Sequence, residues 1–232
     1  MMRYSWWAFL GIWLFTAACS GRPNQTNQQQ TEEVEQDTVP ALENAETGDT
    51  QNILFFGNSL TAGYGLESQD LAFPGIIQHW LDSLDLPYRV INGGLSGETT
   101  AAGKERIDWL LREKIDVFVL ELGANDGLRG IPTDETHQNL QEIVDKVKTR
   151  YPDCQLVLTG MMVPPSMGGE YGKTFTEIFP ALAEKNGMAL VPFLLADVAG
   201  ETELNQGDGI HPTAEGHRIL AKHVWEVLHP LL

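Results

Sequence analysis

From about Ile53 to the C-terminus, short and wholly apolar runs alternate with longer amphipathic stretches. The short runs are rich in Val, Ile, Leu and Phe, a composition typical of strands that are buried on both faces. The predicted strands are Asn52–Phe56, Tyr88–Ile91, Val117–Glu121, Gln155–Met161 and Ala189–Val191. The amphipathic stretches predict helices at about Ala72–Ser83, Thr100–Leu111, Thr133–Arg150, Lys173–Asn186 and Thr213–Leu228.

This alternation of strands and helices predicts the fold class. Buried strands separated by helices form a parallel sheet that is covered on both faces. We therefore expect a three-layer α/β/α domain of the doubly wound, flavodoxin-like type at residues 51–232, with a five-stranded parallel sheet. Ligands of such domains bind at the carboxyl ends of the strands, so the side chains that follow the strands are the first candidates for a functional site.

The first residues have the pattern of an export signal. Arg3 precedes an apolar run, Trp6–Ala18, which is too short to span a bilayer comfortably. The small residues before Cys19 resemble a bacterial lipobox, although Leu is more usual where Thr16 stands. We expect residues 1–18 to be a signal peptide and Cys19 to be acylated. The alternative is an ordinary signal peptide, with an incidental Cys19 and a soluble secreted product.

Residues 19–50 are rich in Gln, Asn, Thr and Glu and hold few large apolar side chains. Such a segment cannot bury enough surface to offset its ordering entropy, so we expect a flexible linker. Nothing later in the chain is apolar for long enough to span a membrane. The predicted product is an exported lipoprotein on the periplasmic or outer-membrane face, anchored by its N-terminal lipid.

Charge and cysteine content narrow the function classes. A net charge of −17 repels phosphate backbones, so nucleic acid is not an expected partner. If Cys19 carries lipid, Cys154 is left alone and cannot form an intrachain disulfide. His217 and His223 lie six residues apart on one predicted helix and share no face, so we expect no metal site. We expect no cofactor either.

Ser59 follows the first predicted strand, within Gly57-Asn58-Ser59-Leu60. A Ser at this point can turn its hydroxyl and its backbone N–H towards the ligand site. The alternative is a Gly-rich turn with Ser as a helix cap. The stretch lacks the end of a Walker A loop, and Thr61 stands where the nucleophile elbow of α/β-hydrolases needs Gly.

Two further loops offer hydrogen-bond donors. The glycines of residues 92–100 allow the backbone to approach a ligand and present an N–H group, although an ordinary strand-to-helix loop explains them equally well. Asn125 follows the third predicted strand, and its amide can donate to a developing oxyanion. The alternative for Asn125 is a local Asn-Asp-Gly turn.

Asp208 and His211 stand three residues apart before the last predicted helix, with Pro212 holding His211 extended. In this arrangement the carboxylate can hold one imidazole nitrogen while the other takes a proton from Ser59. A lone His here would more often be a surface residue. Together the four segments supply every part that acyl transfer needs.

Ser59, Gly97, Asn125 and His211 resemble, in order, the four sequence blocks of the SGNH hydrolases, also called GDSL esterases. The match spans about Ile53 to Leu228 and is most similar to the bacterial thioesterase I/lysophospholipase/arylesterase branch. The resemblance implies a triad and an oxyanion hole. The triad is Ser59, Asp208 and His211; the oxyanion hole is the N–H groups of Ser59 and Gly97 with the Asn125 amide.

The sequence departs from the family signature at one position, since Asn58 replaces the Asp of GDSL. We expect this to alter the hydrogen bonding or pH profile of the turn without abolishing activity. The predicted function is a serine esterase or thioesterase acting on carboxylic acyl or aryl esters and lysophospholipids through an acyl-enzyme. The alternatives are a carbohydrate O-deacetylase on the same scaffold and a non-catalytic lipid- or sugar-binding lipoprotein.

Overall fold

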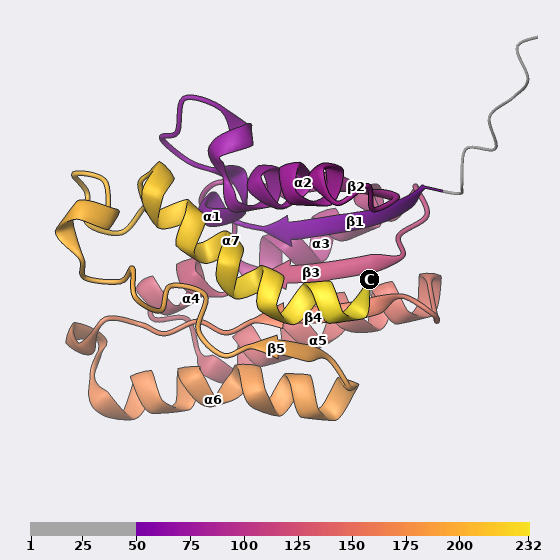
Figure 1. The fold of residues 1–232 in the computed structure, drawn as a ribbon. Coiled ribbons are helices and arrows are strands. Elements are labelled where there is room, and N and C mark those ends of the chain that lie inside the picture. The colour runs from indigo at the N-terminus through magenta and orange to yellow at the C-terminus, as the bar shows by residue number, and fades with distance from the viewer. Residues whose placement is uncertain (1–49) are drawn as a thin grey trace, which may run out of the picture. The chain divides into compact units, whose positions relative to one another are not determined.

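The computed structural model describes residues 50–232, which form one α/β unit around a five-stranded sheet (Figure 1). All neighbouring strands are parallel and their order is β2-β1-β3-β4-β5, the flavodoxin-like order. The strands are β1 Gln51–Gly57, β2 Tyr88–Gly94, β3 Val117–Glu121, β4 Gln155–Thr159 and β5 Ala189–Val191. The predicted fold class is confirmed.

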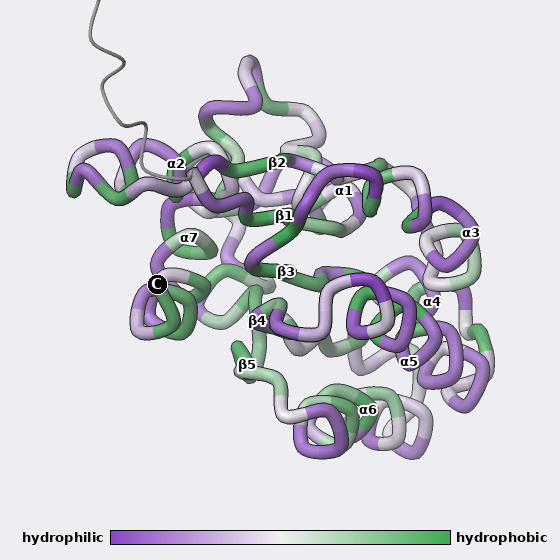
Figure 2. The backbone as a smooth tube through the Cα atoms, turned by 90° about the vertical axis from the view of Figure 1, so that its right-hand side faces the viewer, coloured by the Kyte–Doolittle hydropathy of each residue, from purple (hydrophilic) through white to green (hydrophobic). Residues whose placement is uncertain are grey.

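Helices cover both faces of the sheet. The main helices are α2 Phe73–Ser83, α3 Thr100–Leu110, α5 Thr133–Arg150, α6 Gly169–Asn186 and α7 Ala214–Leu228. Helices α2 and α7 pack together on one face, and α3, α5 and α6 cover the other (Figure 2). The hydrophobic colouring of the central strands in Figure 2 follows their burial, since the side chains of Ile53–Phe56 and Phe118–Leu120 are fully buried. The core therefore fixes the sheet edge at which the candidate residues lie.

The structure adds elements that the hydrophobic pattern does not predict. Two short helices, α1 Ser59–Ala62 and α4 Ala124–Leu128, begin directly after β1 and β3. They are too short to carry an amphipathic repeat, and both carry a residue of the candidate site. The Asn-Asp-Gly sequence at Asn125, for which a local turn was the alternative interpretation, is part of a helix.

Three boundaries differ from the prediction by two residues or more, and one of them is the end of β2, which continues to Gly94, three residues beyond Ile91. Helix α6 begins at Gly169, four residues before Lys173, although glycine disfavours helix. Its first turn is held by a tertiary contact, because the Tyr171 hydroxyl donates to the Ile131 carbonyl over 2.8 Å, and the Tyr171 ring also stacks on Phe175 one turn further along the same helix. Strand β4 ends at Thr159, two residues earlier than predicted.

The predicted signal peptide at 1–18 lies outside the described residues, and so does almost all of the predicted linker at 19–50. Within residues 50–232 no helix is long and apolar enough to cross a membrane. Cys154 is a free, half-buried thiol, and burial followed by the nearby Asp116 charge raises its pKa to about 12. Because only a thiolate is a good nucleophile, this thiol is chemically inert near neutral pH.

Candidate active site

Ser59, His211 and Asp208 form a continuous chain of contacts. The Ser59 hydroxyl oxygen lies 3.0 Å from His211 Nε2, although the two residues are 152 positions apart in the sequence. On the other side of the ring, His211 Nδ1 lies 2.6 Å from Asp208 Oδ2. A hydroxyl, an imidazole and a carboxylate in this order can move a proton from the hydroxyl to the imidazole.

The carboxylate of Asp208 is fixed by the loop that carries it. Its second oxygen, Oδ1, accepts the backbone N–H groups of Ile210 and His211, each at 3.0 Å. The His211 side-chain hydrogen bond and then these two backbone bonds lower the pKa of Asp208 to about 2. Asp208 is therefore an anion at neutral pH.

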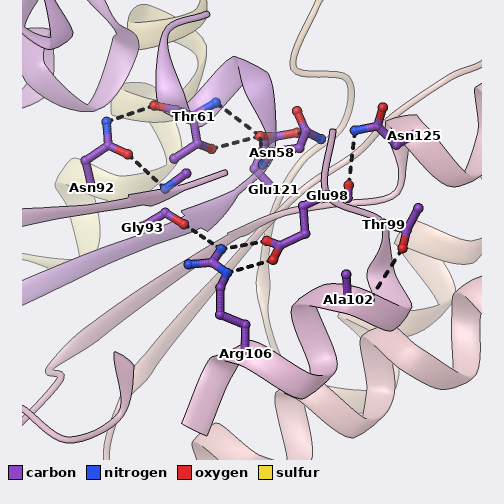
Figure 3. A network of polar contacts seen from close by, with 11 residues as sticks. Asn58, Thr61, Asn92, Gly93, Glu98, Thr99, Ala102, Arg106, Glu121 and Asn125 are labelled. Atoms are coloured by element: carbon purple, nitrogen blue, oxygen red, sulfur yellow. Dashed lines mark hydrogen bonds and ion pairs between the residues drawn. The ribbon is translucent and has the colours of Figure 1, made fainter. Parts of the chain in front are cut away.

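Residues 57–61, here called the Ser59 turn, pack against a buried carboxylate on the neighbouring strand. Glu121 Oε2 accepts the backbone N–H groups of Asn58 and Thr61 and the Thr61 hydroxyl, at 3.1, 3.2 and 2.8 Å. The Asn58 amide donates to the other oxygen, Oε1, over 2.8 Å (Figure 3). Burial, opposed by these hydrogen bonds, raises the pKa of Glu121 to about 7.

Asn58 also caps α1. Its Oδ1 accepts the Leu60 N–H at 3.0 Å and lies 3.4 Å from the Ser59 hydroxyl. Gly57 is needed because the turn lies so close to β3: a Cβ there would come within 2.1 Å of Thr61 Oγ1 and 2.5 Å of Glu121 Oε2. The Ser59 turn is thus held tightly against the core.

The loop after β2, which carries Gly97, and the segment after β3, which carries Asn125, meet beside Ser59. The Asn125 amide donates to the Glu98 carbonyl over 3.0 Å, next to Gly97, whose φ of +80° favours glycine (Figure 3). Glu98 is itself buried and makes a two-pronged ion pair with Arg106, with both N–O distances 2.6 Å. No other described residue accepts the backbone N–H of Ser59 or Gly97, so these groups are free to bind a ligand.

Residues 205–212, here called the His211 loop, are joined to the segment after α1 by one side chain. The Gln206 amide donates to the Tyr64 carbonyl over 2.7 Å and to the Pro212 carbonyl over 2.9 Å. The Gln206 backbone N–H donates to the His211 carbonyl over 2.7 Å. The Tyr64 ring lies against the imidazole of His211, with the ring centres 4.6 Å apart. Gln206 therefore links the position of His211 to that of Tyr64, in the segment that follows the Ser59 turn.

A largely apolar pocket of about 690 Å³ opens over these residues. Ser59, Gly97, Asn125 and His211 lie on its wall. Large apolar side chains make up much of the remaining lining: Leu60, Tyr64, Leu128, Met161, Met162, Val163, Phe193, Leu195 and Ile210. Tyr64, Leu128, Met162 and Ile210 are all more than two-fifths exposed, so the mouth of the pocket is apolar as well.

The remaining histidines do not extend this site. His217 is buried and accepts the Phe73 N–H on Nδ1, and burial followed by the nearby His211 charge lowers its pKa to about 4. It is therefore a neutral packing residue. Within residues 50–232 no three His, Cys, Asp or Glu side chains are grouped so as to hold a metal ion.

The structure brings all five predicted site residues together: Ser59, Gly97, Asn125, Asp208 and His211. Sequence reasoning missed the residues that hold them in place, chiefly Glu121, Glu98 and Gln206. One signal was available for Glu121, which is the single charged residue of an otherwise apolar strand and so must find partners inside the protein. For Gln206 the sequence carries no comparable signal.

Comparisons with known proteins agree with this geometry. Residues 55–219 match the model of the GDSL-like lipase/acylhydrolase family. The chain is 37% identical to esterase TesA of Pseudomonas aeruginosa over 78% of its own length and 90% of that protein. It is 34% identical to an arylesterase of Vibrio mimicus (77% and 88%) and 33% identical to thioesterase 1/protease 1/lysophospholipase L1 of Escherichia coli (78% and 84%). The crystal structure of TesA superposes with a TM-score of 0.75, covering 78% of this chain and all of that one.

Proposed function

The chain belongs to the GDSL-like lipase/acylhydrolase family and is a carboxylic ester hydrolase, and on that premise we propose that Ser59, Asp208 and His211 are its catalytic triad. The observation that carries the proposal is the pair of contacts on the His211 ring, 3.0 Å to Ser59 and 2.6 Å to Asp208. A hydroxyl is a weak nucleophile unless a base at hydrogen-bond distance removes its proton.

In the proposed mechanism, His211 Nε2 takes the Ser59 proton as the hydroxyl oxygen attacks the substrate carbonyl carbon. The resulting oxyanion accepts the N–H groups of Ser59 and Gly97 and the Asn125 amide. Collapse of the tetrahedral intermediate breaks the bond to the alcohol, phenol or thiol, which leaves with the proton from His211. A water molecule, deprotonated by His211, then attacks the acyl-enzyme. The bond between the acyl carbon and the Ser59 oxygen breaks, His211 returns its proton to Ser59, and the acid is released. Asp208 stays ionised and stabilises the imidazolium in both halves.

The pocket lining supports an acyl or aryl ester, or an acyl thioester, in preference to an acetylated sugar. Met161, Met162, Phe193 and Leu195 offer apolar contact to a chain or ring but few hydrogen bonds to sugar hydroxyls. A lysophospholipid fits the same reasoning, since its acyl chain would occupy the apolar wall. The arylesterase and lysophospholipase named among the relatives act on substrates of these kinds.

Two measurements test the proposal. A fluorophosphonate probe should label the wild-type protein and not Ser59→Ala; equal labelling of both would overturn the assignment of Ser59. A substrate panel should contain aryl acetates, longer acyl esters, an acyl thioester, a lysophospholipid and an acetylated sugar. Turnover confined to the acetylated sugar would favour the O-deacetylase instead.

We also propose that the enzyme is exported and anchored by lipid on Cys19, with residues 19–50 as the linker. The support is the sequence pattern alone, because these residues lie outside those that the structure describes. Mass spectrometry of the native N-terminus should find diacylglycerol on Cys19. A mature N-terminus without lipid would mean a soluble secreted enzyme.

A further inference from the structure

Glu121 is a buried carboxylate that takes no part in the proposed reaction. Glu121 is 1% exposed, and among residues 50–232 only the Ser59 turn donates hydrogen bonds to its carboxylate. No Lys, Arg or His of the described residues donates a hydrogen bond to the Glu121 carboxylate. A buried carboxylate without a cation is costly, so such an arrangement needs a compensating role.

That role follows from where the hydrogen bonds go. Both ends of the Ser59 turn are bound to one carboxylate, at Asn58 and at Thr61, so the hydroxyl of Ser59 between them cannot shift independently of β3. Movement of a reacting group by about 1 Å can cost on the order of a hundredfold in rate. Glu121 is thus placed to set the distance from Ser59 to His211.

The amide of Asn58 is matched to this carboxylate. Its oxygen accepts from the backbone of α1, and its nitrogen donates to Glu121 Oε1. An Asp at this position could make the first contact, but at the second it would set two buried carboxyl groups 2.8 Å apart. Two carboxyl groups so close cannot both be ionised and must share a proton.

We propose that Asn58 and Glu121 are a matched pair of positioning residues that fixes the Ser59 turn, with the amide on the turn and the carboxylate on the strand, so that the turn needs no shared proton. This inference rests on the proposed role of Ser59. With Asn at 58, the pair can keep its geometry after Glu121 has lost its proton.

Other charged groups near the pair are engaged elsewhere. On the α3 side Glu98 binds Arg106, and on α4 Asp126 accepts the N–H and hydroxyl of Thr100. Across the pocket Asp208 holds His211. The segments of β1 and β4 beside Glu121 carry no ionisable side chain. The pH behaviour of the pair therefore depends on residues 58 and 121 themselves.

The test is a double-mutant cycle that exchanges the two groups, so that the carboxylate lies on the turn and the amide lies on the strand. Asn58→Asp should keep kcat near the wild-type value at about pH 6, where the two carboxyls share one proton, and lose about tenfold or more above about pH 8. Glu121→Gln presents an amide to donors and should lose about tenfold to a hundredfold at every pH. In the double variant the amide introduced on the strand donates to the carboxylate introduced on the turn, while its oxygen accepts from the turn. Because the donor and acceptor are again matched, kcat should return to within about fivefold of wild type.

The readouts distinguish a positioning role of the pair from a folding defect and from a failure of the proposed function. KM should change little, whereas kcat and the rate of fluorophosphonate labelling should fall and recover together. The control is Asn139→Asp, another buried Asn→Asp change that lies on α5 and does not contact Glu121. Combined with Glu121→Gln it should show additive losses.

The pair proposal is overturned if the double variant is no better than the product of the two single variants, whether because it is inactive or because it fails to fold. It is also overturned if Asn58→Asp has the wild-type pH profile. Failure of the proposed function looks different, because wild-type labelling would then survive in Ser59→Ala.

Discussion

The Ser59 turn and the His211 loop face each other across one 3.0 Å contact but are held by different means. The Ser59 turn belongs to the core: Asn58 and Thr61 are at most 1% exposed, and four hydrogen bonds fasten the turn to Glu121. The His211 loop is open to solvent. The Asp208 side chain is 40% exposed, and backbone hydrogen bonds and Gln206 hold the loop.

Because of this difference, substitutions in the two regions should differ in their effects on stability and activity. Changes that loosen the Ser59 turn should cost both stability and activity, because buried polar groups lose their partners. Changes in the His211 loop should cost activity with little loss of stability, because water can replace the lost contacts. Substitutions in the Ser59 turn and in the His211 loop therefore test this difference.

The largest effect is expected from the reacting groups themselves. Ser59→Ala and His211→Ala should each lower kcat by several orders of magnitude, since neither the nucleophile nor its base can be replaced by water in the same position. Steady-state hydrolysis of an aryl ester measures this, with the exposed residues Ser83→Ala and His79→Ala as controls. A rate within about tenfold of wild type in either variant would remove that residue from the triad.

Asp208→Asn changes the His211 loop and leaves the Ser59 turn unchanged. It should lower kcat by about a thousandfold to ten-thousandfold, because the amide favours the wrong imidazole tautomer. The melting temperature should barely change. Since the pKa of Asp208 is lowered to about 2, any stability from this group is present above its ordinary pKa and is lost only as the pH falls towards 2. A large loss of thermal stability at neutral pH would contradict the contrast.

Asn125→Ala removes a partly buried hydrogen-bond donor beside the Ser59 turn. The expected loss is about a hundredfold to a thousandfold in kcat, with a much smaller change in KM, because the amide is needed for the oxyanion rather than for the bound ester. Asn186→Ala, which also removes an amide bonded to a backbone carbonyl, is a control remote from the pocket. Equal changes in kcat and KM would assign Asn125 to ground-state binding.

The contrast also explains what the sequence could predict. The central strands β1, β3 and β4 were predictable because a strand buried on both faces is largely apolar, as Phe118–Leu120 is; the edge strand β2, with exposed Arg89, gives a weaker signal. Ser59, Asn125, Asp208 and His211 were predictable because their chemical types follow strand ends or precede the last helix, and Gly97 because its sequence block resembles that of the SGNH hydrolases. Both signals are local in the sequence.

The supporting contacts were not predictable in this way. Glu121 is joined to Asn58 across 63 positions and Gln206 to Tyr64 across 142, and nothing near either residue in the sequence names its partner. The short helix α1 was missed for a related reason. It is held by the Asn58 cap and the contact with Glu121 rather than by its own apolar repeat.

The stability of the protein should also depend on pH through the buried Glu121 carboxylate. Burial raises the pKa of Glu121 from 4.5 to about 7, so the folded state holds a proton that the unfolded state has released between these values. The free energy of unfolding should therefore fall as the pH rises from about 4.5 to 7, by on the order of 1–3 kcal/mol. Denaturant titrations across this range measure the slope. Buried Asp126, whose pKa is also raised, adds to it, so the part due to Glu121 is the part that Glu121→Gln removes.

The smallest effect is expected where the two regions are joined. Gln206→Ala removes two side-chain hydrogen bonds, to Tyr64 and Pro212, and leaves its backbone bond to His211 in place. Because water can reach the freed carbonyl of Tyr64, kcat should fall only about threefold to tenfold. Gln138→Ala, whose amide bonds only the exposed Glu142, is the matched control. A loss comparable to that of Asp208→Asn would mean that the His211 loop depends on this one side chain as strongly as the Ser59 turn depends on Glu121. In that case the two sides of the site would be equally rigid.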